Sequence, residues 1–342
     1  MKIGIQADGG NTIGIGHVMR TLVLAKELAK TNDVFYICRI NSKEMEKYAS
    51  GIKRIKEYGF NVRTISEETF IEELCKIKAD CLITDSYDVD EQYFNIIKKN
   101  FKITIYIDDM NLHYFNVDIL INQNINAEKL EYKVNKDTEL LLGIDYLMLR
   151  DEFRNTSKSI NKPKIKDIMI TIGGSDNNSI TNKLCEYIKD LDFEFHIIIG
   201  PSFKDDNIKK LVNLSIEKKN IKLYFNANMF LVMKKCDIAI SACGSTLYEL
   251  MACGIPTLGI IVAENQKLIA MNLHDNKVIY NLGWYKNLSK KKIYDKINDL
   301  NINKRNLMSE YGRRIIDGNG VYRIAENINE YESKIKNMED RI

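Results

Sequence analysis

The chain has 342 residues, with 50 lysines and arginines against 47 aspartates and glutamates, and a formal net charge of +3. This length suffices for two domains that each bury a core, and the near balance of charge, with lysines scattered along the chain, gives no case for nucleic-acid binding. The N-terminus has no signal-peptide pattern and no run is apolar enough to span a membrane, so we expect a cytoplasmic protein. The seven cysteines lack metal-binding spacing, so we expect reduced thiols and no metal site.

Short runs rich in β-branched residues alternate with amphipathic segments, which is the pattern of parallel sheets with helical crossovers. The strands predicted in the first half lie at 2–8, 33–39, 61–65, 81–85 and 102–108, with helices near 17–31, 43–57, 67–77 and 90–99. The strands predicted in the second half lie at 167–173, 193–200, 221–226, 236–242 and 255–262. The sequence therefore predicts an α/β protein with two Rossmann-like units in series.

A polar stretch that contains the first proline interrupts this alternation and is the best candidate for a linker. The predicted organisation is an N-terminal Rossmann-like domain over 1–154, a linker over 155–166, a C-terminal Rossmann-like domain over 167–320 and a helical tail over 321–342.

The loop after the first strand reads IGIGHVMR, from Ile13 to Arg20. Gly14 and Gly16 allow the backbone to turn tightly and approach a ligand, and the helix that begins near His17 directs free N–H groups towards an anion. The positive end of that helix disfavours an imidazolium and keeps the ring able to accept a proton near pH 7. A purely structural histidine beside packing glycines is the alternative.

Two loops of the second half are candidates for a nucleotide site. In SACGSTLYE, the backbone and hydroxyls of Gly244, Ser245 and Thr246 can cradle a diphosphate, and Glu249 is placed to accept hydrogen bonds from ribose hydroxyls. An ordinary N-cap followed by an exposed glutamate is the alternative. In TIGGSD, the glycines 173 and 174 can admit a phosphate or a uracil edge, but a tight turn would have the same sequence.

Acidic residues end two predicted strands of the first half, at Asp85 and Asp88 around Tyr87, and at Asp108 and Asp109. These carboxylates can orient a histidine, bind sugar hydroxyls or simply cap helices. A further histidine, His196, lies inside an apolar strand and is expected to be a satisfied core residue.

Seven segments, taken together, resemble one enzyme family. They are ADGGNTIGIGHVMR, DSYDVD, YIDDMN, YLMLRDEF, TIGGSD, SACGSTLYELMACGIPTL and AENQ. Over most of its length the chain resembles the UDP-2,4-diacetamido-2,4,6-trideoxy-β-L-altropyranose hydrolases of pseudaminic acid biosynthesis and their spore-coat-polysaccharide relatives. The resemblance implies a GT-B architecture, in which two Rossmann-like domains with parallel sheets face each other across a cleft.

The resemblance also implies a function: metal-independent and cofactor-free hydrolysis of a UDP-sugar, with inversion, by a protein we expect to be a monomer. Its motifs place a general base at His17 and further catalytic residues at Tyr87 and Asn265. The residues implied in binding UDP or the sugar are Gly14, Gly16, Arg20, Gly173, Gly174, Gly244, Ser245, Thr246, Glu249 and Gln266. Some members have Asp-His-Tyr where this chain has Asp85-Ser86-Tyr87, so no role for that second histidine carries over.

Two other classes of function remain open. A GT-B glycosyltransferase would use the same UDP site and move the sugar to an acceptor hydroxyl, but we see no apolar or basic acceptor-facing patch in the first half. A non-catalytic nucleotide-sugar binding protein would have no need for a histidine at position 17. Release of UDP without an added acceptor separates the three.

Overall fold

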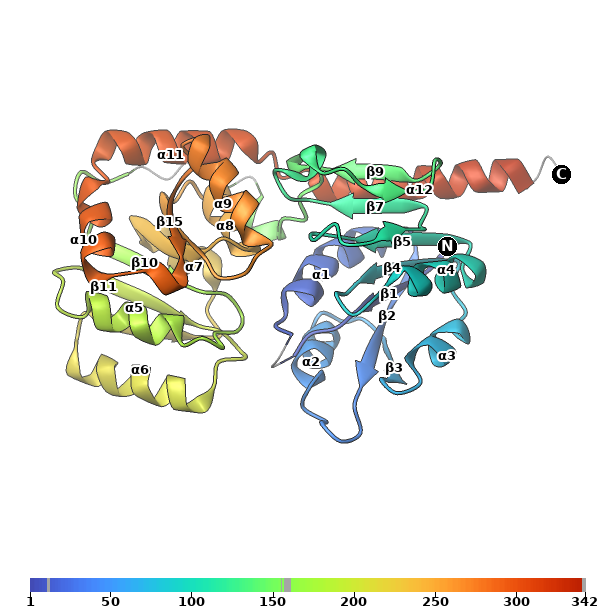
Figure 1. Cartoon of the computed structure of the whole chain (residues 1–342), viewed down its shortest axis with the longest axis horizontal. Coiled ribbons are helices and arrows are strands. Elements are labelled where there is room, and N and C mark those ends of the chain that lie inside the picture. Colours follow the sequence, from blue (N-terminus) through green and yellow to red (C-terminus); the bar gives the residue numbers. More distant parts are fainter. Residues whose placement is uncertain (11–12, 155, 157–160, 340–342) are drawn as a thin grey trace. The chain divides into compact units, whose positions relative to one another are not determined.

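The computed structural model describes the chain except residues 11–12, 155, 157–160 and 340–342. It divides into two units: unit 1 comprises Met1–Leu149 and Gly318–Ile342, and unit 2 comprises Arg150–Asp317 (Figure 1). Each unit carries one parallel sheet with helical crossovers, as the alternation of strands and helices predicts. Part of the predicted linker, residues 155 and 157–160, lies outside the described residues, and the domain boundaries drawn from the sequence stay predictions.

The sheet of unit 1 has seven strands in the order β3-β2-β1-β4-β5-β7-β9. These strands are β1 (Lys2–Ala7), β2 (Asp33–Ile40), β3 (Val62–Ser66), β4 (Cys81–Asp85), β5 (Ile103–Ile107), β7 (Ile119–Asn122) and β9 (Glu139–Leu142), and a separate pair is formed by β6 (Tyr114–Phe115) and β8 (Lys133–Val134). The helices of this unit are α1 (Gly16–Leu28), α2 (Ala49–Glu57), α3 (Phe70–Cys75), α4 (Glu91–Asn100) and α12 (Gly320–Glu339). The five strands predicted in this half are therefore present, with two further strands at one edge.

The helix predicted over 43–57 is shorter in the structure and begins at Ala49. The side chain of Asn41 accepts hydrogen bonds from the backbone N–H groups of Lys43, at 2.9 Å, and of Glu44, at 3.0 Å. Such local side-chain bonds offer the backbone an alternative to a helix. The segment before Ala49 is therefore a turn.

The sheet of unit 2 has six strands in the order β12-β11-β10-β13-β14-β15. These strands are β10 (Asp167–Thr171), β11 (Glu194–Ile199), β12 (Ile221–Phe225), β13 (Ile238–Ala242), β14 (Thr257–Ile261) and β15 (Ile279–Trp284). The helices are α5 (Ile180–Ile188), α6 (Asp205–Glu217), α7 (Met229–Lys235), α8 (Ser245–Ala252), α9 (Gln266–Asp275), α10 (Lys290–Asp299) and α11 (Ile302–Ile315). The five predicted strands are again present, and β15 is added at the edge.

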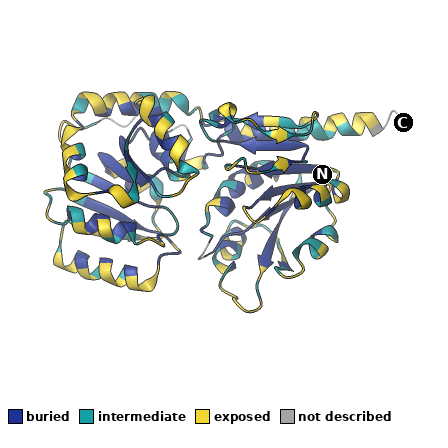
Figure 2. Ribbon diagram, in the orientation of Figure 1, coloured by how far each residue is buried: buried dark blue, intermediate teal, exposed yellow. Residues whose placement is uncertain are grey.

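The central strands of both sheets are buried, and the helices that cover them keep an exposed outer face (Figure 2). His196 of β11 is fully buried, as expected of a core residue. Its Nε2 lies 2.7 Å from Asp167 Oδ1 and its Nδ1 lies 2.8 Å from the Tyr224 hydroxyl. Since both ring nitrogens are satisfied, this histidine has a structural explanation. None of the described helices is long and apolar enough to span a membrane.

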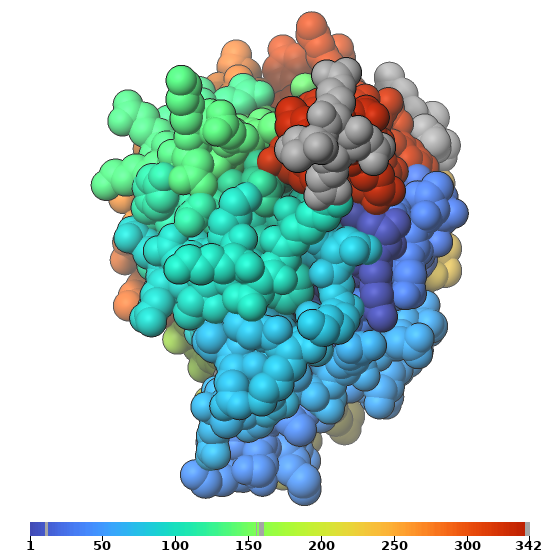
Figure 3. Space-filling model, turned by 90° about the vertical axis from the view of Figure 1, so that its right-hand side faces the viewer, coloured from blue at the N-terminus to red at the C-terminus, as the bar shows by residue number. Residues whose placement is uncertain are grey.

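The C-terminal helix α12 packs onto unit 1. Its residues Val321, Ile324 and Ile328 are fully buried in the same apolar core as β1 and α1, and the red C-terminal segment lies against other parts of the unit in Figure 3. At the start of α12 a Cβ atom on Gly320 would lie 2.3 Å from the backbone nitrogen of Leu147, so only glycine fits there. The tail therefore completes the core of unit 1.

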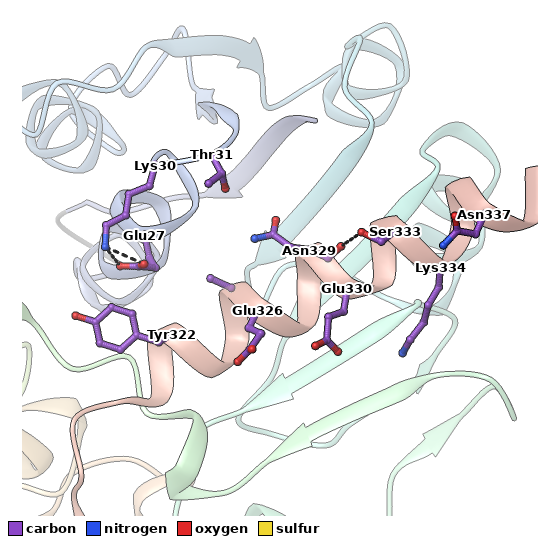
Figure 4. A pocket seen from close by; sticks show the side chains of 11 residues that line it. Glu27, Lys30, Thr31, Tyr322, Glu326, Asn329, Glu330, Ser333, Lys334 and Asn337 are labelled. Atoms are coloured by element: carbon purple, nitrogen blue, oxygen red, sulfur yellow. Dashed lines mark hydrogen bonds and ion pairs between the residues drawn. The ribbon is translucent and has the colours of Figure 1, made fainter. Parts of the chain in front are cut away.

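A groove of about 750 Å³ lies between the end of α1 and the outer side of α12 (Figure 4). Most of the residues that line it are of polar types, among them Glu326, Asn329 and Lys334 of α12, but most of its exposed surface is apolar. Lys30 and Glu27, on the α1 side, form an ion pair at 2.7 Å. This groove is lined by none of the residues that the sequence predicts for catalysis or nucleotide binding.

Candidate active site

The strand order of unit 1 reverses between β1 and β4. These two strands are neighbours, and Ala7 at the end of β1 lies opposite Asp85 at the end of β4. Ligands of open parallel sheets bind at the carboxyl ends of strands where the strand order reverses. Because the loop after β1 leads into α1, this topology brings His17 to Asp85 although the two are 68 positions apart in the sequence.

The glycines of the first loop fix its path. Gly14 has a φ of 79°, a left-handed conformation that favours glycine, and it exchanges two backbone hydrogen bonds with Gly10, at 2.8 and 2.9 Å. A Cβ on Gly10 would lie 1.6 Å from the carbonyl oxygen of Lys47. By contrast, a Cβ on Gly16 would meet no atom of the described residues within 4 Å, apart from its chain neighbours and its own helix backbone. The backbone is therefore held at Gly10 and Gly14 and open to an approaching ligand at Gly16.

His17 belongs to a buried network of charges. Its Nδ1 lies 2.6 Å from Oδ1 of Asp85, and Arg20 donates to both oxygens of Asp85, from Nε and Nη2, each at 2.5 Å. Arg20 Nη1 also donates to Oδ2 of Asp109 at 3.0 Å, and the Tyr87 hydroxyl donates to that same oxygen at 2.8 Å. The ring of Tyr87 stands edge-on to the imidazole, with centroids 4.5 Å apart.

The contacts of this network shift the pKa values of Asp85 and Tyr87. Burial opposes ionisation of Asp85, but Arg20 and then His17 hold the pKa of this carboxyl below its usual range. Burial, together with the carboxylate of Asp109, raises the pKa of Tyr87. Asp85 is therefore an anion and Tyr87 a neutral hydroxyl at physiological pH.

A cavity of about 400 Å³ opens beside the imidazole, a size suited to a small ligand. It is lined by Asp8, Ile13, His17, Arg39, Lys47, Asp85, Ser86, Tyr87 and Asp88. Arg39 donates from Nε to Asp8 at 2.7 Å and from Nη2 to Asp88 at 2.7 Å. Asp8, Arg39 and Lys47 were not predicted from the sequence, although Asp8 and Arg39 each end a predicted strand.

The strand order of unit 2 also reverses, between β10 and β13, where Thr171 lies opposite Ser241. The loops that follow these two strands contain the predicted glycine pair, 173 and 174, and the predicted Gly244, Ser245 and Thr246. Helix α8 begins at Ser245, and Gly244 precedes it without a side-chain cap. This edge of the unit 2 sheet thus brings both predicted nucleotide loops to neighbouring strands.

Glu249 has a partner that the sequence did not reveal. Arg150 donates from Nε to Oε1 at 2.7 Å and from Nη2 to Oε2 at 2.8 Å. Burial raises the pKa of Glu249, although Arg150 opposes that shift. The carboxylate of Glu249 is thus paired with the guanidinium of Arg150. Its contact with ribose stays a prediction.

The predicted Asn265 and Gln266 lie at the start of α9 in unit 2. Oε1 of Gln266 accepts a hydrogen bond from the backbone of Val262 at 3.1 Å, and its Nε2 would lie 3.5 Å from a Cβ on Gly244. Gln266 is therefore next to the beginning of α8. The structure places His17, Arg20 and Tyr87 together in unit 1, and the catalytic role of Asn265 stays a prediction.

Among the described residues, no group of three or more histidines, cysteines and acidic residues has the arrangement of a metal site. The carboxylates of Asp85 and Asp109 are engaged in hydrogen bonds and ion pairs within unit 1. Arg20, predicted to bind substrate, bridges these two carboxylates.

Comparison with known proteins identifies related chains. The chain is 34% identical over 281 residues to the uncharacterized protein MJ1062 of Methanocaldococcus jannaschii, covering 78% of this chain and only 57% of that protein. It is 28% identical over 278 residues to the UDP-2,4-diacetamido-2,4,6-trideoxy-beta-L-altropyranose hydrolase of Campylobacter jejuni, covering 79% and 95%. It is 25% identical over 358 residues to the spore coat polysaccharide biosynthesis protein SpsG of Bacillus subtilis, covering 98% and 100%.

Solved structures share the fold at low sequence identity. MurG of Acinetobacter baumannii aligns over 96% of this chain and 99% of that chain, with a TM-score of 0.65 and 13% identity. Anabaena HepE, solved in complex with UDP and glucose, aligns over 97% and 99%, with a TM-score of 0.63 and 12% identity. The family model of the glycosyltransferase family 28 C-terminal domain matches residues 167–328. The chain therefore has the predicted GT-B fold, and its residues 167–328 match the glycosyltransferase family 28 C-terminal domain.

Proposed function

We propose that this protein hydrolyses a UDP-linked 2,4-diacetamido-2,4,6-trideoxy sugar to the free sugar and UDP, with inversion and without a metal. The observation that carries the proposal is the state of His17. Its Nδ1 is engaged by Asp85, its Nε2 has no hydrogen-bond partner among the described residues, and the ring lines a cavity of about 400 Å³. A histidine in this arrangement is suited to remove a proton from a bound water.

UDP binding is assigned to unit 2. The N-terminus of α8, which no described side chain caps, offers backbone N–H groups and the positive end of a helix dipole to a diphosphate. The same groups stabilise the negative charge that develops on UDP as it leaves. The match of residues 167–328 to a glycosyltransferase domain supports this assignment.

The reaction is a single displacement. Nε2 of His17 takes a proton from water, the water oxygen bonds to the anomeric carbon, and the bond from that carbon to the diphosphate oxygen breaks. The products are the free sugar and UDP, and the imidazolium returns its proton to solvent. General-base assistance of this kind contributes roughly 10² to 10⁴ in rate.

The charges around the cavity suit an uncharged sugar. Arg39 is neutralised by Asp8 and Asp88, and Lys47 pairs with Glu67 at 2.6 Å. Neither cation is left to attract a carboxylate or phosphate on the sugar, whereas the paired groups can still hydrogen-bond to hydroxyl and acetamido groups. We place this reaction in nonulosonic acid or surface polysaccharide biosynthesis, and the name of the Bacillus relative supports the latter.

The alternative is a GT-B glycosyltransferase that moves the sugar to an acceptor hydroxyl. The family 28 match and the likeness to MurG favour it. In that case water would be a poor substitute for the acceptor.

The test is to incubate the protein with the UDP-sugar and no acceptor. We expect UDP and free sugar to appear in equal amounts, over many turnovers per protein molecule, measured by anion-exchange chromatography. Turnover that requires an added saccharide or lipid acceptor would support the transferase instead, and UDP-sugar binding without turnover would indicate a non-catalytic protein.

A further inference from the structure

The shortest contact of the imidazole determines where its proton lies. Nδ1 of His17 is 2.6 Å from Oδ1 of Asp85, and Asp85 is fully buried. A carboxylate that is ionised can only accept a hydrogen bond. The proton of the neutral ring must therefore be on Nδ1, which leaves the lone pair on Nε2.

Arg20 keeps Asp85 in that state. It donates to both oxygens of the carboxylate, and two parallel bonds from a guanidinium fix the plane of a carboxylate as well as its charge. Arg20 Nη2 is also 3.3 Å from Nδ1 of His17. Because Nδ1 carries a hydrogen and donates it to the closer Oδ1 of Asp85, it has no lone pair to accept a hydrogen bond from Arg20. Arg20 therefore acts on His17 through Asp85.

A third layer of contacts holds the guanidinium. Asp109 accepts from Arg20 at 3.0 Å and from the hydroxyl of Tyr87 at 2.8 Å, while the ring of Tyr87 packs edge-on against His17. Three groups thus face the imidazole: Arg20 of α1, Asp85 at the end of β4 and Tyr87 in the loop after β4. Hydrogen bonds link Asp85 to Arg20 and, through Asp109, Arg20 to Tyr87. The ring is held by an anion at Nδ1 and by an aromatic edge at its side.

We propose that Asp85, clamped by Arg20, is the positioning residue that holds His17 in the Nδ1–H tautomer and so makes Nε2 the proton acceptor. This inference rests on the proposed hydrolysis for its catalytic consequence. When Nε2 accepts the proton of water, both ring nitrogens carry hydrogen, and the buried carboxylate stabilises the resulting imidazolium. Asp85 keeps its negative charge throughout and acts through His17.

The tautomer is measured directly in the wild-type protein. The chain has 4 histidines, so ¹⁵N spectra of the imidazole nitrogens can be assigned to His17 by comparison with His17→Gln. In the UDP-free protein, on the high-pH side of the ring's titration, we expect Nδ1 to carry the proton and Nε2 to be bare. A proton on Nε2 in that state would overturn the inference, and this measurement requires no variant of Asp85.

The kinetic test uses Asp85→Asn with Asp118→Asn as its matched control. An asparagine has one acceptor oxygen, so it cannot satisfy Arg20 at both positions and also fix the proton of His17. We expect kcat to fall roughly 10²- to 10⁴-fold, as for a catalytic histidine that loses its tautomer, with KM changed much less and the Nδ1–H signature lost. Asp118 is a buried aspartate of the same unit that pairs with Lys98, and its asparagine variant is expected to keep a near-wild-type kcat.

Two outcomes distinguish this inference from the proposed function. A wild-type Nε2–H tautomer, or Asp85→Asn with unchanged kcat, would overturn the positioning role even if UDP-sugar hydrolysis is observed. An Nδ1–H tautomer that Asp85→Asn abolishes, in a protein without hydrolase activity, would support the positioning role and reject the proposed reaction.

Discussion

Replacing His17 by glutamine is expected to lower kcat at least about 100-fold, the lower end of what a general base contributes. Nε2 of this residue has no partner among the described residues and the ring borders the cavity, so the change removes the proton acceptor together with the contacts of the ring with Asp85 and Tyr87. Binding of UDP is assigned to unit 2, so the dissociation constant of UDP should stay within about threefold, because an interaction made only in the transition state affects kcat and not ground-state binding.

The control for this variant is His274→Gln. His274 is an exposed histidine of unit 2 with two long hydrogen bonds: Nδ1 lies 3.4 Å from the carbonyl oxygen of Ile279 and 3.4 Å from the backbone nitrogen of Asn281, and the ring stands edge-on to Tyr280. Its replacement should leave turnover and UDP binding unchanged. If His17→Gln retained most of its turnover, or if it lost UDP binding in calorimetry, His17 would not be the base.

Replacing Glu249 by alanine is expected to weaken UDP binding by about 1–3 kcal/mol, the cost of removing one partner from a set of buried polar groups. This corresponds to roughly a 5- to 150-fold rise in the dissociation constant. The carboxylate is held by two hydrogen bonds from Arg150, which orients it and keeps its remaining lone pairs available for ribose hydroxyls. Isothermal calorimetry with UDP measures the effect.

Loss of Glu249 also removes two of the hydrogen bonds of Arg150, which keeps Glu152 at 3.0 Å, so the thermal stability of the variant has to be recorded beside its affinity. Glu264→Ala is the matched control, because Glu264 is an exposed glutamate of the same unit, 3.8 Å from Lys267. It should bind UDP as the wild type does. An unchanged dissociation constant for a folded Glu249→Ala would remove Glu249 from the nucleotide site.

The sequence allowed five strands of each sheet to be predicted, because runs such as CLITD and CDIAISA are short, apolar and rich in β-branched residues. It did not allow β7, β9 and β15 to be predicted. β7 and β9 have four residues each, too few to show a period. β15 contains Asn281 and Gly283, which interrupt the apolar pattern.

The C-terminal tail illustrates a second limit. The sequence predicts that the tail is helical, but an apolar stripe on a helix does not show which hydrophobic core the helix packs against. In the structure Val321, Ile324 and Ile328 are buried with strands from the start of the chain. Only the tertiary fold shows that the last helix belongs to the first unit.

The candidate site was predictable where it depended on local sequence. Gly14, Gly16 and His17 stand within four positions of one another, so their shared loop could be recognised. The partner of His17 could not be chosen among the acidic strand ends, because that choice depends on β1 and β4 being neighbours, which no local pattern reveals. The same reason hid the ion pairs of Arg39 with Asp8 and of Arg150 with Glu249, which join separate elements.

The central claim is a direct attack of water on the anomeric carbon, with His17 as base. A double displacement would instead need a carboxylate that attacks this carbon. The structure engages Asp85 with Arg20 and His17, Asp109 with Arg20 and Tyr87, and Asp108 with Tyr132. Asp88, whose side chain is 62% exposed beside the cavity, is the least constrained of these four acids.

The most direct test is proton NMR of the sugar as it is first released from the UDP-sugar, before mutarotation. The account predicts an anomer with the configuration opposite to that of the substrate. A product with retained configuration, or a sugar covalently trapped on Asp88, would contradict direct attack by water and transfer the catalytic role from His17 to a carboxylate.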